Sequence, residues 1–121
     1  MEKDIPKPVR WIGSSYDDWQ AFPEAVQDVL GYALHLAQNG KKASNAKPLK
    51  GFMGTTVMEI VDDYDGKAWR AVYTIQFQDI IYVLHAFQKK SKQGIATPKP
   101  DMALIKHRLR LAKEHYETYQ A

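Results

Sequence analysis

The sequence predicts an α+β fold in which helices at both ends of the chain pack on one antiparallel sheet. Residues 23–40 carry apolar side chains at helical spacing, and residues 97–119 carry a second amphipathic helical pattern. Between them, the runs 55–63, 68–77 and 79–87 are rich in β-branched and aromatic residues, as strands are. This order predicts a sheet that is covered on one face by helices.

The size and composition of the chain predict a single domain over residues 1–121. Its hydrophobic fraction of 45% and charged fraction of 26% are those of an ordinary globular protein. No apolar run reaches the roughly 18 residues of a membrane helix, and the polar first residues do not resemble a signal peptide. We therefore expect a cytoplasmic protein with no membrane partner.

In the first half of the chain we expect a short strand followed by two helices. Residues 9–13 are apolar and end at a glycine, which is typical of a strand. Ser14 or Ser15 can cap a short helix. Pro23 ends that helix and opens the longer one at its first turn, and the Asn-Gly pair at 39–40 stops it.

In the second half, the pair Asp65-Gly66 predicts a two-residue hairpin turn between the first two strand runs. A short turn near Gln78 precedes the third run. Strict alternation along that run puts four side chains on one face of the sheet, namely Ile81, Val83, His85 and Phe87. The last helix presents an apolar face formed by Met102, Ile105, Leu109, Ala112 and Tyr116.

Positive charge is concentrated in two segments, although the net charge is only +3. Residues 41–50 contain four lysines and no acid, and residues 89–113 contain eight basic residues against Asp101 alone. Acidic residues collect in the first forty positions and in 59–65. This segregation predicts one positively charged face, as in nucleic-acid-binding proteins, and two solvated basic loops are the alternative.

Two residues of the strand runs are candidates for chemistry. Arg70 interrupts a core-like strand, so its guanidinium needs a partner. A two-residue hairpin turn places Glu59 close to it, which predicts a salt bridge, and an arginine on a rigid strand can also bind a phosphate bidentately. His85 ends the third run just before the lysines, and we expect either one structural hydrogen bond or a direct function for it.

Several chemistries lack their usual motifs. The chain has no cysteine, no glycine-rich phosphate loop, no HExxH and no GxSxG. The four histidines lack metal-ligand spacing with a carboxylate. We therefore expect neither a metal nor another cofactor.

The stretches "KPLKGF", "MEI", "WRAVY", "VLHAFQKKSKQGIATPKPD" and "HRLR" resemble, in this order, the HigB/RelE-like toxins and within them the phage-related, Tad-like branch. The resemblance spans roughly residues 9–113, and the run "LHAFQKKS" followed by "TP" and then Arg108 is its most specific part. It implies a microbial-RNase-type antiparallel sheet with an N-terminal helical pair and a C-terminal helix. It also implies a metal-independent endoribonuclease that cleaves messenger RNA on the ribosome, inhibits translation and arrests growth. A cognate antitoxin, usually a helix-turn-helix DNA-binding protein, would neutralise it.

The resemblance also implies roles for individual residues. Arg70 matches the strand arginine that stabilises the phosphate, and Lys89 and Lys90 match the basic pair at the end of the last strand. Lys47 and Lys50, before the hairpin, would follow the RNA backbone. The remaining RNA-binding candidates are Lys92, as a further backbone contact, and Tyr73 and Phe87, which stack on a base or are ordinary core residues.

The acid–base residues of the family are not matched. The RelE branch uses two lysines on the second strand, where this chain has Glu59 and Val61. The YoeB branch uses a glutamate at the position where this chain has Lys47. Either Glu59 and His85 take over the proton transfers, or catalysis depends mainly on electrostatics. Two other functions remain open, namely a non-catalytic toxin of the same fold that inhibits gyrase and a basic RNA-binding module.

Overall fold

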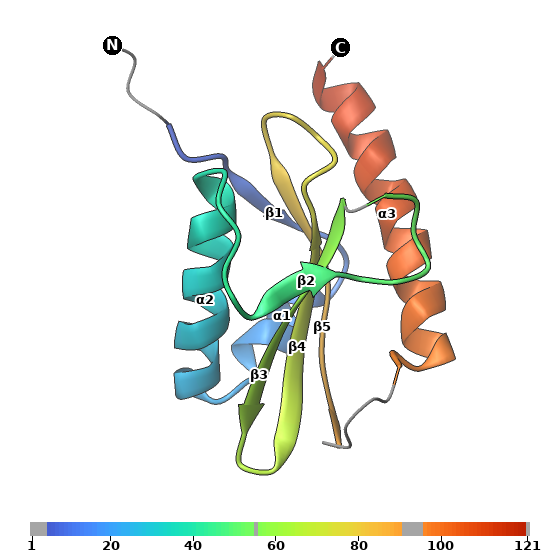
Figure 1. Cartoon of the computed structure of the whole chain (residues 1–121). Helices are drawn as coiled ribbons and strands as arrows, with labels where there is room; N and C mark the ends of the chain where they lie inside the picture. Colours follow the sequence, from blue (N-terminus) through green and yellow to red (C-terminus); the bar gives the residue numbers. More distant parts are fainter. Residues whose placement is uncertain (1–4, 55, 91–95, 121) are drawn as a thin grey trace.

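The computed structural model describes residues 5–54, 56–90 and 96–120, and in this part of the chain one five-stranded sheet lies between helices (Figure 1). The sheet order is β1-β5-β4-β3-β2, with β1 parallel to β5 and all other neighbours antiparallel. The predicted α+β class, the N-terminal helical pair and the C-terminal helix are confirmed. In chain order the elements are β1 (Val9–Trp11), α1 (Ser15–Gln20), α2 (Glu24–Gln38), β2 (Ala46–Pro48), β3 (Val57–Tyr64), β4 (Lys67–Thr74), β5 (Ile81–Lys90) and α3 (Lys99–Gln120).

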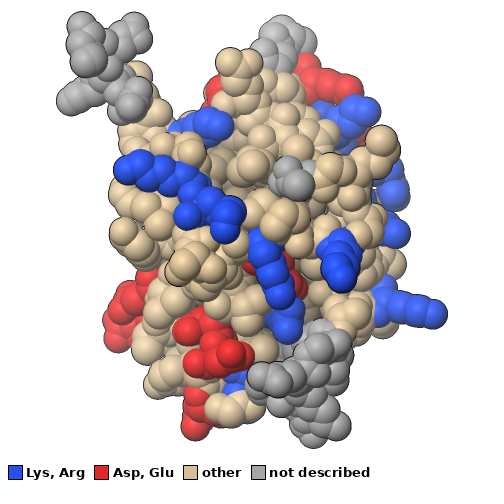
Figure 2. All heavy atoms as spheres, viewed as in Figure 1, with Lys and Arg blue, Asp and Glu red and all other residues tan. Residues whose placement is uncertain are grey.

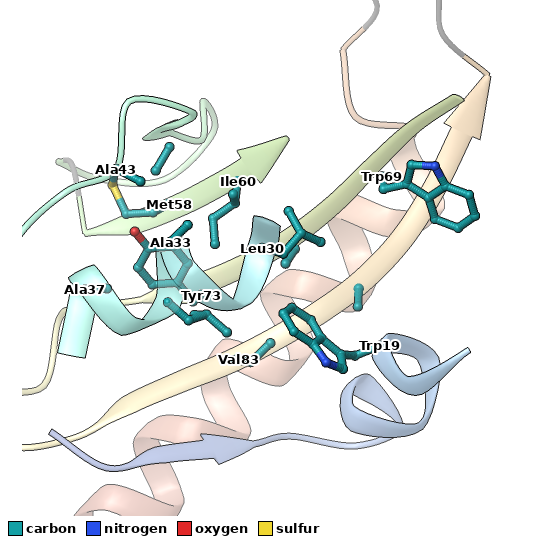
Figure 3. Close-up of a cluster of buried hydrophobic side chains, with 14 of the residues drawn as sticks. Trp19, Leu30, Ala33, Ala37, Ala43, Met58, Ile60, Trp69, Tyr73 and Val83 are labelled. Carbon is teal, nitrogen blue, oxygen red and sulfur yellow. The ribbon is translucent and has the colours of Figure 1, made fainter. Parts of the chain in front are cut away.

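The helices cover both faces of the sheet, whereas the sequence pattern predicted one covered face. On one face, α1 and α2 pack around a core that includes Leu30, Ile60 and Tyr73 (Figure 3). On the other face, Ile105 and Ala112 of α3 pack on the sheet. Figure 1 shows the result as α2 and α3 on opposite sides of the strands. Apolar spacing identifies the buried side of each helix but does not say which face of the sheet that side covers.

The buried faces of the two long helices agree with the predicted spacing. In α2 one apolar residue at helical spacing, Val29, is exposed and does not belong to the buried face. On the predicted apolar face of α3, Ile105 and Ala112 belong to one core cluster, and Met102, Leu109 and Tyr116 pack against it. None of the described helices is long and apolar enough to cross a membrane.

The β3–β4 hairpin has the predicted two-residue turn. Asp65 and Gly66 both have left-handed backbones, with φ of 54° and 76°, and Tyr64 pairs with Lys67 on either side of them. Two positive φ values are typical of a type I′ turn, which matches the twist of the strands. The turn fixes the register of the hairpin, so Glu59 pairs with Val72.

The predicted strict alternation along β5 is wrong, because the strand contains a bulge. Val72 pairs with His85 and Tyr73 pairs with Val83, which leaves Leu84 as an extra residue. Before the bulge, Val83 belongs to the core under α2. After it, His85 shares a face with Val72, which belongs to the core under α3. As a result of the bulge, Ile81 and Val83 face α2, whereas His85 and Phe87 face α3.

Candidate functional site

A pocket of about 420 Å³ lies between β2, the sheet and the segment that enters α3. Three basic side chains line it, together with one carboxylate, one hydroxyl and an apolar wall. Its size is that of a small-ligand pocket. Its lining includes Lys47, Lys50, Arg70, Glu59, Thr97, Leu49 and Met102.

Strand pairing brings these residues together from distant parts of the sequence. Lys47 of β2 pairs with Glu59 of β3, and Glu59 pairs with Val72 of β4. Val72 in turn pairs with His85 of β5, so one row of residues runs across four strands. Paired residues share a face, which here is the α3 face. The short strand β2, which the sequence analysis did not predict, puts Lys47 into this row.

Arg70 and Glu59 form the predicted salt bridge at the pocket. Arg70 Nη1 lies 2.8 Å from Glu59 Oε2, and the side chains are 13% and 3% exposed. Thr97 Oγ1 donates a hydrogen bond of 3.3 Å to the same carboxylate oxygen. Arg70 Nε is buried and has no hydrogen-bond partner among the described residues. The guanidinium is thus held on one side and keeps an unused donor.

The charge around the pocket favours an anion. Lys47 and Lys50 are exposed beside the mostly buried Arg70, so three cations face the single carboxylate of Glu59. Figure 2 shows basic side chains over β2 and along α3 on this face, and acidic ones toward the tip of the β3–β4 hairpin, over α2 and near the end of α3. A phosphate that enters the pocket would meet charge-assisted donors within a partly desolvated site.

His85 lies beside this pocket and is not one of its lining residues. It is 6% exposed, and its Nε2 lies 2.7 Å from Asp101 Oδ1 at the start of α3. Its Nδ1 is buried without a hydrogen-bond partner in the described part of the chain. The ring stacks on Phe87 with centroids 4.6 Å apart. Because His85 is buried and does not line the pocket, the structure gives no direct support for its proton-transfer role, which stays a prediction.

The two predicted base-stacking residues have different environments. Tyr73 is 1% exposed and lies in the core under α2, on the face away from the pocket. The prediction that Tyr73 stacks on a base is therefore wrong for this structure. Burial raises the pKa of its hydroxyl to about 12. Phe87 is half-buried and pairs with Arg70, so its stacking role stays a prediction.

The lysines after the last strand are placed only in part. The backbone of Lys89 pairs with Ala68, and that of Lys90 pairs with Lys67, at the end of β5. Lys92 lies outside the described residues. The roles of these three lysines stay predictions.

The structure adds residues that the sequence analysis did not select for the site. Thr97 and Met102 line the pocket, and Asp101 binds His85. The sequence did single out Asp101, because it is the one acidic residue within the basic segment 89–113. Arg108 has a structural environment, because its guanidinium donates 3.0 Å hydrogen bonds to Leu84 O and Ser14 Oγ. Burial lowers the pKa of Arg108.

The chain has a RelE-like fold, as comparison with solved structures shows. The chain is similar to the isolated E. coli RelE toxin, with a TM-score of 0.57 and 14% identity over 72% of this chain and 88% of that one. It is also similar to a double arginine-to-alanine mutant of E. coli RelE in the free state, with a TM-score of 0.51 and 14% identity over 68% and 82%. A RelBE2 toxin–antitoxin complex from Mycobacterium tuberculosis matches with a TM-score of 0.48 and 15% identity over 75% and 100%.

The sequence itself identifies the family. Residues 17–110 match the family described as "Phage derived protein Gp49-like (DUF891)", and the chain belongs to it. No curated protein sequence matches the chain. The predicted relation to RelE-like toxins of phage-related type is therefore confirmed.

Proposed function

We propose that this protein is the toxin of a toxin–antitoxin pair and that it inhibits translation by cleaving messenger RNA on the ribosome. The observation that carries the proposal is the Arg70–Glu59 pair in a pocket flanked by Lys47 and Lys50. The family and the RelE-like fold support the toxin class. The pocket supports the chemistry, because a partly buried guanidinium with nearby lysines suits an RNA phosphate.

The reaction that fits these groups is attack of a ribose 2′-hydroxyl oxygen on the adjacent phosphorus. The bond from phosphorus to the 5′-oxygen breaks, and that oxygen takes up a proton. Arg70 would stabilise the charge that develops on the phosphate. Glu59 is the carboxylate that lines the pocket, so we assign it the 2′-hydroxyl proton. Lys89 or Lys90 would neutralise the phosphate and supply the proton of the leaving oxygen.

The partners follow from the same proposal. The substrate would be messenger RNA presented by the ribosome, and Lys47, Lys50 and Lys92 would bind its backbone, with Phe87 against a base. A cognate antitoxin, of helix-turn-helix type, would silence the protein in the cytoplasm. The reaction uses no metal or other cofactor. Within the HigB/RelE-like superfamily, we assign the chain to the phage-related, Tad-like branch.

The test is induced expression of the wild type and of Arg70→Ala, with growth and transcript 5′ ends followed in the same cells. Arg10→Ala is the matched control, because Arg10 is an exposed arginine on β1. Since Arg70→Ala also removes a structural ion pair, a Lys47→Ala, Lys50→Ala double variant changes only exposed side chains. We expect new 5′ ends inside reading frames for the wild type and Arg10→Ala, and few for the other variants.

Two results would redirect the proposal. Growth arrest without new 5′ ends would support a toxin that acts by binding, such as a gyrase inhibitor. Salt-dependent RNA binding with neither arrest nor cleavage would support an RNA-binding module. If the wild type, Arg70→Ala and the Lys47→Ala, Lys50→Ala double variant all cleave equally, the pocket has no part in the mechanism.

A further inference from the structure

Two contacts tie the beginning of α3 to the sheet, and both use a carboxylate. Asp101, in the first turn of α3, accepts a hydrogen bond from His85 on β5 at 2.7 Å. Four residues earlier, Thr97 donates to Glu59 on β3 at 3.3 Å. Glu59 and His85 belong to the same cross-strand row, with Val72 between them. At the usual spacing of strands, the two anchors are roughly 10 Å apart.

Residues at both ends of the segment that enters α3 form one wall of the pocket. Thr97 and Met102 line the pocket, and Met102 directly follows Asp101. Met102 N donates a hydrogen bond to Pro98 O at 2.9 Å, which makes the segment a continuous turn into α3. A displacement of Asp101 from His85 would therefore move Met102 and loosen Thr97 over Arg70.

We propose that His85 and Asp101 form a positioning pair that holds this wall in place over Arg70, and that protonation of His85 tightens it. Only the identity of the bound ligand rests on the proposed function. A protonated His85 always presents an N–H to Asp101. A neutral ring spends part of its time as the tautomer whose Nε2 lone pair faces the carboxylate, and that tautomer repels it.

The surroundings of His85 define what else could influence the pair. Phe87 covers one side of the ring, and His85 is nearly inaccessible to water. The elements packed against β5 are α1, β1, β4 and α3, and their charged groups include Asp18, Arg10, Arg70, Asp101 and Arg108. Of these, Asp101 is the one for which the structure shows a direct contact with the ring.

The experiment follows the methyl signals of Met102 and Thr97 by NMR while pH is varied through the titration of His85. In the wild type, both signals should shift with the midpoint of the His85 ring signals. Met53 is 94% exposed and supplies an internal reference that should not follow this midpoint. In Asp101→Asn, the His85 ring should still titrate while the two methyl signals stop following it.

Two further variants separate positioning from loss of fold. His85→Gln retains an N–H donor for Asp101 but cannot titrate, so the Met102 signal should stay near its low-pH position at every pH. Asp28→Asn makes the same chemical change as Asp101→Asn at an exposed site on α2, and it should behave as the wild type. If Asp101→Asn does not fold, His85→Gln decides the question alone. A Met102 signal that titrates equally in the wild type and His85→Gln overturns the proposal.

Binding of inorganic phosphate adds the link to the pocket. At a pH where His85 is protonated, Asp101→Asn should bind phosphate about fivefold or more weakly than the wild type. His85→Gln should retain the wild-type affinity. If the wild type binds no phosphate, the proposed function loses its anion site, whereas the methyl titrations still decide whether the positioning pair exists. Equal phosphate affinity in Asp101→Asn and the wild type would contradict the effect on the pocket.

Discussion

Removal of one partner of the Arg70–Glu59 ion pair gives the sharpest test of how this pocket is built. In Glu59→Met, the carboxylate is replaced by an apolar side chain of similar length. Arg70 then loses its partner at 2.8 Å, and its buried Nε already has no hydrogen-bond partner among the described residues. Its guanidinium, 13% exposed, would be left with charge that little solvent can reach.

The expected cost follows from this burial. Breaking a buried ion pair from one side destabilises proteins by about 3–5 kcal/mol. Because the pocket admits some water to Arg70, we expect the lower end, about 3 kcal/mol. For a chain of this length, that is a fall in melting temperature of roughly 10 °C. Replacing both residues, in Glu59→Met with Arg70→Met, removes the unpaired charge and should recover most of the loss.

The assay is urea unfolding of the wild type, both single variants and the double variant, combined as a double-mutant cycle. We expect a coupling energy of about 2 kcal/mol or more between the two sites. It should change little between low and high salt, since buried pairs are weakly screened. Costs of the single variants that simply add in the double variant would refute the reasoning. The ion pair would then behave as a solvated surface contact.

Three further predictions concern separate features of the chain. Gly51→Ala should cost about 1–3 kcal/mol, because Gly51 has a φ of +101° and an added Cβ would lie 2.9 Å from Met102 Cε; Gly54→Ala, with positive φ but open space, is its control in thermal unfolding. Burial raises the pKa of Tyr73 to about 12, so its neutral form stabilises the fold below pH 10. That stability should be lost between about pH 10 and 12, at about 1.4 kcal/mol per pH unit, and Tyr73→Phe should remove this part of the alkaline loss in denaturant titrations. Lys50→Ala should lower the slope of log affinity for single-stranded RNA against log salt by about 1, and an unchanged slope would exclude Lys50 from the backbone contacts.

Local signals in the sequence predicted the elements whose structure is local. The Asp65-Gly66 turn follows from two residues that tolerate positive φ, and it fixes the register that brings Glu59 and Arg70 together. The buried face of α3 follows from its apolar spacing alone. In each case the interaction that decides the structure lies within a few residues along the chain.

The errors arose where distant segments decide the structure. The strand β5 pairs with both β1 and β4, and no local pattern within it marks the bulge at Leu84. The bulge reverses the faces predicted for His85 and Phe87. The strand β2 is three residues long and ends in a proline, so its residues give almost no sequence signal for a strand. Asp101 acquires a role only because α3 crosses above His85, which the sequence does not encode locally.

The position of β5 in the sheet also dictates the order in which the newly made chain can mature. β5 is the last strand to be synthesised, yet it lies between β1 and β4. The buried hydroxyl of Ser15 donates to Val83 O across 68 residues, so α1 also waits for β5. The strand β1 and the helix α1 consequently stay undocked until residues 81–90 have been made. The row of Lys47, Glu59, Val72 and His85 spans four strands, so it is completed only when β5 joins the sheet.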